Sequence, residues 1–157
     1  MEHMKISGVA KDSDVARIAL VGLRDEPGVA FKMFRVLANA KINIDIILQS
    51  IGRNETNDIS FTVSRGDMEK AVEILEENKE IIGYSDISAN DKIAKVSIVG
   101  AGMLSSPGVA AMMFEALYDS KINIAMISTS EIKVSVLVDE NEADRSVAAI
   151  HAKFFGA

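Results

Sequence analysis

The sequence predicts an α+β protein made of two copies of one unit, in which helices cover one face of an antiparallel sheet. Three observations carry this prediction: a repeated turn-and-helix motif, apolar runs whose period switches between two and about 3.6 residues, and the order of those runs. The motif Asp25-Glu26-Pro27-Gly28-Val29-Ala30 recurs as Ser105-Ser106-Pro107-Gly108-Val109-Ala110. Lys-Ile-Asn-Ile follows at residues 41–44 and again at 121–124. The two prolines keep one separation (107 − 27 = 80), which indicates an internal duplication.

The first half of copy one contains a strand, a helix and a second strand. Residues 17–21 form a β-rich run that ends at the Asp-Glu-Pro-Gly turn, where a helix is expected to begin. Apolar residues then return at helical spacing, and they are Ala30, Met33, Phe34, Leu37 and Ala38. From Ile42 the period becomes two, which predicts a strand over residues 42–49 with one polar face.

The second half of copy one completes the unit. A polar turn at residues 52–57 precedes an alternating run at 59–63, so the two strands are expected to form a hairpin. Residues 68–75 follow helical spacing, and residues 84–89 are a further strand candidate. The order strand, helix, strand, strand, helix, strand is typical of the ferredoxin-like βαββαβ fold.

Copy two repeats this plan but ends early. Strands are expected at residues 95–99, 122–126 and 133–138, and helices at 110–117 and 143–154. Only Gly156 and Ala157 follow the last helix, so the module lacks its closing strand, and the opening segment near residues 6–10 is expected to supply it. The predicted modules are residues 14–83, and residues 1–13 together with 84–157.

Composition excludes several classes of protein. Seventeen Lys and Arg against 23 Asp and Glu give a net charge of −6, which repels nucleic acid. Cysteine is absent, so no disulfide or thiolate metal site is expected. No apolar run reaches membrane-spanning length, and no signal peptide is recognisable, so a cytoplasmic location is expected. We expect no metal, no cofactor and no catalytic residue in this chain, because no nucleophile-and-base pair, metal-ligand cluster or phosphate loop with lysine is visible.

The turn before the first helix is the strongest candidate for a binding site. Proline presets the turn, glycine lets a ligand approach the backbone, and the N–H groups at the start of the helix can bind a carboxylate. Carboxylates and amides on the turn and on the polar face of the next strand can bind an amine and a small polar side chain. Together these groups suit a free amino acid. The candidate residues are Asp25, Gly28, Val29, Ala30, Asn43, Asp45 and Gln49.

A plain structural role is the alternative for each of these groups taken alone, because Pro-Gly often caps a helix and polar strand residues often face water. The difference between the copies favours binding. Asp25 becomes Ser105, Asp45 becomes Ala125 and Gln49 becomes Thr129, whereas the Pro, Gly, Phe, Leu and Ile positions are kept. Asn123 is kept too, and it is a candidate to reach across an interface between modules, where small ligands commonly bind.

The repeated motifs are similar to the tandem ACT domains of aspartate kinase. The similarity covers nearly the whole chain and includes Val99-Gly100-Ala101-Gly102-Met103 and Ser128-Thr129-Ser130-Glu131. It implies a regulatory part that senses threonine, lysine or both for feedback inhibition of a catalytic kinase subunit or domain. It also implies a homodimer and a threonine-type site that adds Asn123 and Ile124 of the second module to Asp25, Gly28, Ala30, Asp45 and Gln49 of the first.

Other functions remain open from the residues. A free-standing ACT-domain sensor would bind an amino acid but act on a different partner. An acylphosphatase-like enzyme would need an arginine-bearing phosphate loop, and Arg24 and Arg53 show none. An RNA-binding module would need aromatic residues on the sheet, which a 5% aromatic content and the negative charge disfavour.

Overall fold

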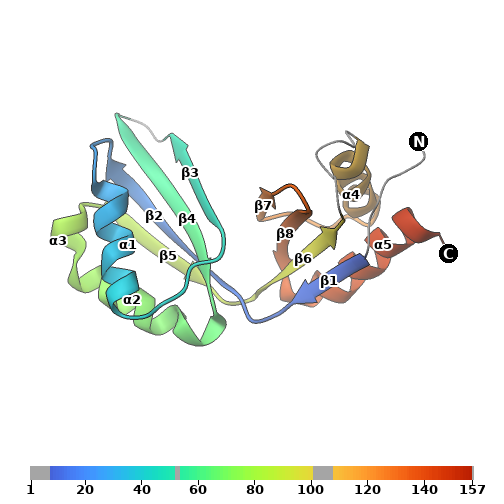
Figure 1. Cartoon of the computed structure of the whole chain (residues 1–157), viewed down its shortest axis with the longest axis horizontal. Coiled ribbons are helices and arrows are strands. Elements are labelled where there is room, and N and C mark those ends of the chain that lie inside the picture. The colour runs from blue at the N-terminus through green and yellow to red at the C-terminus, as the bar shows by residue number, and fades with distance from the viewer. Residues whose placement is uncertain (1–7, 52–53, 101–107, 157) are drawn as a thin grey trace. The chain divides into compact units, whose positions relative to one another are not determined.

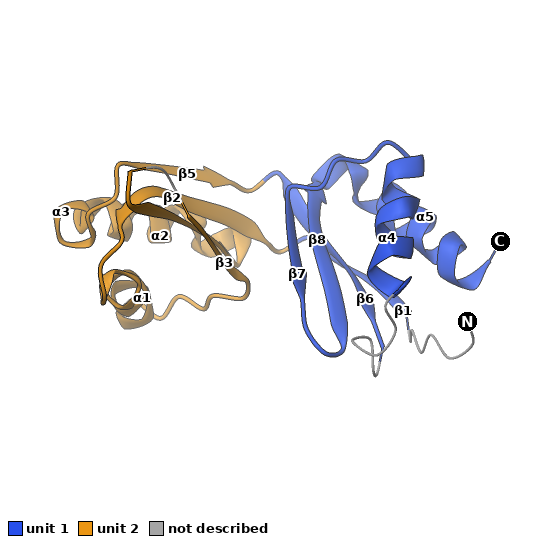
Figure 2. Cartoon of the chain, turned by 90° about the horizontal axis from the view of Figure 1, so that it is seen from above, with its two compact units in different colours: residues 1–13, 92–157 blue, residues 14–91 orange. Residues whose placement is uncertain are grey.

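The structure, a computed structural model, describes residues 8–51, 54–100 and 108–156. The chain divides into two compact units, Asp14–Asp91 and Met1–Ser13 with Lys92–Ala157 (Figure 2). Each unit contains a four-stranded antiparallel sheet with helices packed on one face (Figure 1). The predicted fold class, two ferredoxin-like modules of the α+β type, is therefore confirmed.

The sheet of the first unit has the strand order β3-β4-β2-β5. The turn of Pro27 and Gly28 ends the first strand, and apolar residues at helical spacing then bury one side of α1 against the sheet. The elements are β2 Ala16–Arg24, α1 Val29–Asn39, β3 Ile47–Ile51, β4 Thr56–Val63, the 3-10 turn Arg65–Asp67, α2 Met68–Glu77, α3 Lys79–Ile82 and β5 Asp86–Asn90.

The sheet of the second unit has the order β1-β6-β8-β7. Its β1 comes from the start of the chain and pairs with β6 from Gly8↔Val99 to Asp12↔Lys95. The strand expected near residues 6–10 thus lies at 8–12, and Ile6 is outside the described residues. The elements are β1 Gly8–Asp12, β6 Ile93–Val99, α4 Gly108–Asp119, β7 Met126–Thr129, β8 Lys133–Asp139, the 3-10 turn Glu140–Glu142 and α5 Ala143–Phe155.

The boundary between the modules differs from the sequence expectation. The predicted module bounds placed residues 84–91 in the second module, although the order of elements assigned the strand at 84–89 to copy one. In the structure β5 pairs with β2 from Arg17↔Asn90 to Val21↔Asp86. These backbone hydrogen bonds place β5 in the first unit, which continues to Asp91. The fourth strand of the other sheet is β1, so residues 84–91 are not needed there.

Each unit has its own apolar core between sheet and helices. In the first unit Ile18, Leu20 and Phe61 of the sheet pack against Met33 and Leu37 of α1, and all five are fully buried. In the second unit, Val96, Ile98, Met113, Leu117 and Ile150 form the corresponding cluster. The core residues of each cluster belong to one unit, so the first unit has a complete core of its own.

The segment after α1 is the main local departure from expectation. A strand was predicted from residue 42, whereas β3 begins at Ile47. Thr62 explains the difference, because its carbonyl accepts the Asp45 N–H at 3.1 Å and its buried hydroxyl accepts the Ile46 N–H at 3.0 Å. Two consecutive residues therefore bond to one residue of β4, which interrupts the regular ladder as a bulge does.

Candidate functional site

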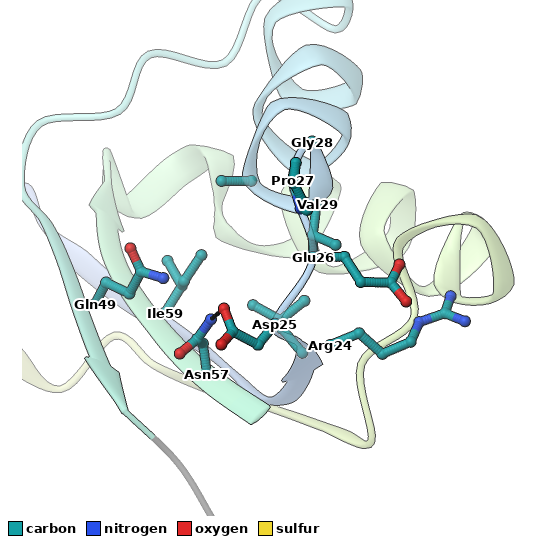
Figure 3. A pocket seen from close by; sticks show the side chains of 11 residues that line it. Arg24, Asp25, Glu26, Pro27, Gly28, Val29, Gln49, Asn57 and Ile59 are labelled. Atoms are coloured by element: carbon teal, nitrogen blue, oxygen red, sulfur yellow. Dashed lines mark hydrogen bonds between the residues drawn. The ribbon is translucent and has the colours of Figure 1, made fainter. Parts of the chain in front are cut away.

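A cavity of about 330 Å³ lies in the first unit, at the N-terminus of α1 (Figure 3). This volume lies within the range of small-molecule pockets. Five of the residues predicted from the sequence line it, and they are Asp25, Gly28, Val29, Ala30 and Gln49. The remaining lining residues are Leu23, Arg24, Glu26, Pro27, Asn57 and Ile59.

Gly28 shapes the upper edge of the cavity. It has a φ of 88°, in the left-handed region that favours glycine, and it forms the N-cap of α1 without a side-chain hydrogen bond. A Cβ at this position would meet nothing within 4 Å, so backbone conformation, and not space, requires the glycine. From the sequence, the glycine was expected to let a ligand approach the backbone; the structure adds a conformational reason for it, the positive φ.

The N-terminus of α1 gives the cavity a site for a negative charge. The first helical bond runs from the Lys32 N–H to the Gly28 carbonyl at 3.0 Å. The N–H groups of Ala30 and Phe31 therefore precede the helical ladder, and Ala30 lines the cavity. The first turn carries no acidic side chain that would compete for them. A carboxylate placed here would also gain from the helix dipole.

Asp25 gives the same cavity a negative charge of its own. The Asn57 amide donates from Nδ2 to Asp25 Oδ1 at 3.1 Å, drawn as the dashed line in Figure 3. The Asp25 backbone N–H donates to the carbonyl of Glu55 at 3.2 Å. The main chain of Asp25 is thus held by Glu55, just before β4, and its side chain by Asn57 at the start of β4.

A bulge in β2 directs the chain into this turn. The register between β2 and β4 shifts between Leu20 and Leu23, where Gly22 takes a φ of 74°. The Gly22 N–H donates to Asp58 Oδ1 at 2.9 Å, so a β4 side chain takes the place of a ladder carbonyl. The strand end that carries Asp25 therefore has a fixed position.

Apolar and amide groups form the rest of the wall. Leu23, Val29 and Ile59 are buried, with 1%, 6% and 3% of their surfaces exposed. Gln49 of β3 pairs with Ile59 of β4, and paired residues share one face of a sheet, so the Gln49 amide lies beside this apolar wall. Arg24 lies against Gly83, since a Cβ there would come within 2.5 Å of Arg24 Nη2.

This arrangement suits binding of a zwitterion. A carboxylate fits at the N-terminus of α1, an ammonium group fits at Asp25, and the space between is partly apolar with one amide. The described residues that line the cavity include no hydroxyl, thiol or imidazole side chain. They therefore offer no nucleophile of the serine, threonine or cysteine type.

Comparison with known proteins identifies the family of the chain. The pattern of the ACT domain matches residues 18–78 and 96–154. The regulatory subunit of aspartate kinase from Thermus thermophilus, solved in its ligand-free form, is 39% identical with a TM-score of 0.89, and the alignment covers 96% of this chain and 99% of that one. The chain belongs to the ACT-domain regulatory region of aspartate kinases.

Two further relatives are similar to this chain, one over nearly its whole length and one over part of a longer enzyme. A structure of aspartokinase alpha and beta subunits contains a chain 46% identical to it, with a TM-score of 0.88 and coverage of 95% of this chain and 98% of that chain. The aspartokinase of Mycolicibacterium smegmatis is 47% identical over 98% of this chain, which spans only 37% of that enzyme. Among the described helices, none is long and apolar enough to span a lipid bilayer.

Four of the binding residues predicted from the sequence are not among the described residues that line the cavity. Asn43 and Asp45 are exposed and are not among the described residues that line it. The bulge opposite Thr62 separates them from Gln49, so the strict alternation that grouped the three is broken. Asn123 is exposed and Ile124 is half-buried in the second unit. The second Pro-Gly turn, residues 105–107, is outside the described residues.

Sequence reasoning missed Asn57, the partner of Asp25. Residues 52–57 were assigned to a polar turn, but β4 begins at Thr56, and Asn57 pairs with Leu23 of β2. The register between β2 and β4 is the signal that would have found it, because Asn57 lies opposite Leu23, only two positions before Asp25.

Proposed function

We propose that this chain is the allosteric, amino-acid-sensing part of an aspartate kinase and that it binds threonine, lysine or both. The observation that carries the proposal is the cavity with the Asp25 carboxylate at one side and the open N–H groups of α1 at another. A free amino acid brings one ammonium group and one carboxylate, and it can satisfy both at once.

Support for each effector comes from different wall residues. The amide of Gln49 can bond to the hydroxyl of threonine, while Leu23, Val29 and Ile59 can receive its methyl group. Lysine carries a second ammonium group, for which Glu26 at the cavity offers a second carboxylate. The wall residues therefore suit both threonine and lysine.

The remaining expected residues belong to this proposal as well. We place Asn43 and Asp45, on the exposed segment before β3, among the residues that contact the effector in the assembled protein. Asn123 and Ile124 would contribute from the second module of a partner chain in a homodimer. The roles of Asp45, Asn123 and Ile124 rest on the similarity to aspartate kinases, and the role of Asn43 rests on the polar face predicted for its segment.

The regulatory role requires a catalytic partner, because the relatives are longer enzymes of which this chain matches 37%. The partner would be an aspartate kinase domain or subunit, which phosphorylates aspartate with ATP.

Effector binding would then shift that kinase toward an inactive arrangement and give feedback inhibition of amino-acid biosynthesis. The effector must bind the two states with different affinity, since equal binding shifts nothing. A cytoplasmic location follows from the same role.

A thermal-shift screen of the twenty amino acids tests the sensing function. At one hundred times its dissociation constant, a ligand stabilises the folded protein by about 2.7 kcal/mol. For a chain of this size that is a rise in Tm of about 5–10 °C. We expect threonine, lysine or both to give such a rise, and Asp45→Ala to reduce it. No response to any of the twenty amino acids would overturn the proposal.

Addition of an aspartate kinase catalytic subunit tests the partner. We expect a complex whose kinase activity falls when the stabilising amino acid is added. Binding of the amino acid without association with the kinase would instead identify a sensor that acts on a different partner.

A further inference from the structure

We infer that Asn57 is a positioning residue of the cavity, which holds the Asp25 carboxylate and forms with it a paired acceptor for the ammonium group of an amino acid. The inference rests on the proposed function, because it names how the same cavity recognises the amine. Asn57 is not part of the repeated motifs from which the other binding residues were predicted.

The hydrogen bond between the two side chains fixes the orientation of both. A carboxylate only accepts hydrogen bonds, so the atom of Asn57 that faces Asp25 is the amide nitrogen, 3.1 Å from Oδ1. The remaining acceptors of the pair are then the amide oxygen of Asn57 and the second carboxylate oxygen of Asp25. Both residues line the cavity (Figure 3). An ammonium group has three N–H donors and can bond to both oxygens.

The backbone holds this pair from two sides. Asn57 pairs with Leu23 in the ladder between β4 and β2, which sets its distance from the turn. The next residue of β4, Asp58, accepts the Gly22 N–H and fixes the bulge that leads to Asp25. Asp58 thus holds the bulge before the turn, and Asn57 holds the Asp25 carboxylate. Because both groups are ordered before a ligand arrives, binding costs less conformational entropy.

The second copy supplies an internal comparison. Ser60 of β4 corresponds to Ser135 of β8 (135 − 60 = 75), so Asn57 corresponds to Ile132 (57 + 75 = 132) and Asp25 to Ser105. Amide and carboxylate are thus replaced together. The Ile132 carbonyl still accepts the Gly100 N–H at 2.8 Å, and β8 forms normally after it. The second module therefore folds with isoleucine at this position, so the shared fold does not in itself require an amide there.

Asn57→Ile is accordingly the informative variant, because it introduces the residue that the second copy contains. NMR titration measures dissociation constants from the micromolar to the millimolar range, so weak binding by a variant remains measurable. The ligands are L-threonine, L-lysine and 2,3-dihydroxybutanoate, in which a hydroxyl replaces the ammonium group of threonine. Asn141→Ala is the matched control, since Asn141 lies in the second unit and its backbone N–H, not its side chain, bonds to Asp139.

We expect Asn57→Ile to raise the dissociation constant of the amino acid by about tenfold or more, the usual effect of losing a hydrogen bond to a charged group. The affinity for the hydroxy acid should change by less than about twofold, because it has no ammonium group for the pair to bind. Asn57→Gln keeps the amide and should restore part of the affinity. Asn141→Ala should bind like the unchanged chain.

Three results would count against the inference in distinguishable ways. If the unchanged chain binds neither amino acid, the proposed function fails and the inference fails with it. If Asn57→Ile binds the amino acid as tightly as the unchanged chain, only the inference fails. If it loses affinity for the amino acid and the hydroxy acid equally, Asn57 has a structural role, and the assignment to the ammonium group is wrong.

Discussion

Leu37 and Leu117 occupy the same position in the two modules, and their carbonyls make the same bond. Both side chains are fully buried. The Leu37 carbonyl accepts the Ile42 N–H at 3.0 Å, and the Leu117 carbonyl accepts the Ile122 N–H at 2.9 Å. The residue before each isoleucine, Lys41 or Lys121, has a positive φ, 61° and 57° respectively. The duplication therefore extends to the backbone conformation that ends each first helix.

We expect truncation of either leucine to destabilise the protein by a similar amount. Leu37→Ala and Leu117→Ala each remove a fully buried side chain from a closed core, so each should lower the free energy of unfolding by about 2–5 kcal/mol. Urea denaturation followed by circular dichroism measures both. A cost below about 0.5 kcal/mol at either position, the range of surface substitutions, would contradict the description of two equivalent cores.

A strained turn is expected in Gly28→Ala. The φ of 88° is unfavourable for alanine although the space is open, so the variant should lose about 1–2 kcal/mol of stability and bind the amino acid more weakly. Gly66→Ala is the matched control, because it also has open space but no φ in the left-handed region. Thermal denaturation and calorimetric titration compare the two. If both variants behave alike, the conformation of Gly28 is unimportant.

Asp25→Ala should separate binding from stability. The side chain is exposed, so its loss should change the free energy of unfolding by no more than about 0.5 kcal/mol. Its loss from the cavity removes the counter-charge of the ammonium group, and affinity for the amino acid should fall by about tenfold or more. Isothermal titration calorimetry gives this value, with Asp119→Ala, an exposed acid of α4, as the control. If Asp25→Ala binds the amino acid with unchanged affinity, the ammonium group does not bind at Asp25.

Tyr84 gives a prediction about pH. Its hydroxyl donates to the Leu75 carbonyl at 3.0 Å, and burial, assisted by Glu76, raises its pKa above the usual 10.0. A raised pKa in the folded state means that the contribution to stability is complete below pH 10 and is lost as the pH rises through the folded value. Tyr84→Phe should therefore cost about 1 kcal/mol at neutral pH, and the difference from the unchanged chain should shrink above pH 10.

Tyr118 provides the control for that experiment, because it is the other tyrosine and exposes 80% of its surface. Tyr118→Phe should leave the free energy of unfolding nearly unchanged at every pH. Urea denaturation at pH 7 to 11 measures both variants. A Tyr84→Phe difference that stays constant across this range would contradict the role of burial.

The fold could be predicted from the sequence because the signals for its helices and turns are local. Each consists of a few neighbouring residues, and both modules contain them. Pro27 and Gly28 begin α1, and the apolar spacing through Leu37 continues it. These signals lie within one segment of chain. The short helix α3 was not predicted, since four residues are too few to show a helical period.

Contacts between distant segments explain what the sequence could not predict. The start of β3 depends on Thr62, sixteen residues after Ile46, whose buried hydroxyl accepts a backbone N–H. The place of Asn57 in the cavity depends on the register between β2 and β4, which shifts at the bulge. Gln49, predicted from its strand, does line the cavity because it lies on the regular part of β3.

A crystal structure of the chain with saturating L-threonine, and a second with L-lysine, tests the central claim most directly. The account predicts that at least one amino acid occupies the cavity of the first unit, with its ammonium group at Asp25 and Asn57 and its carboxylate at the N–H groups of Ala30 and Phe31. An empty cavity in both crystals, or an amino acid bound with its charges reversed, would contradict it.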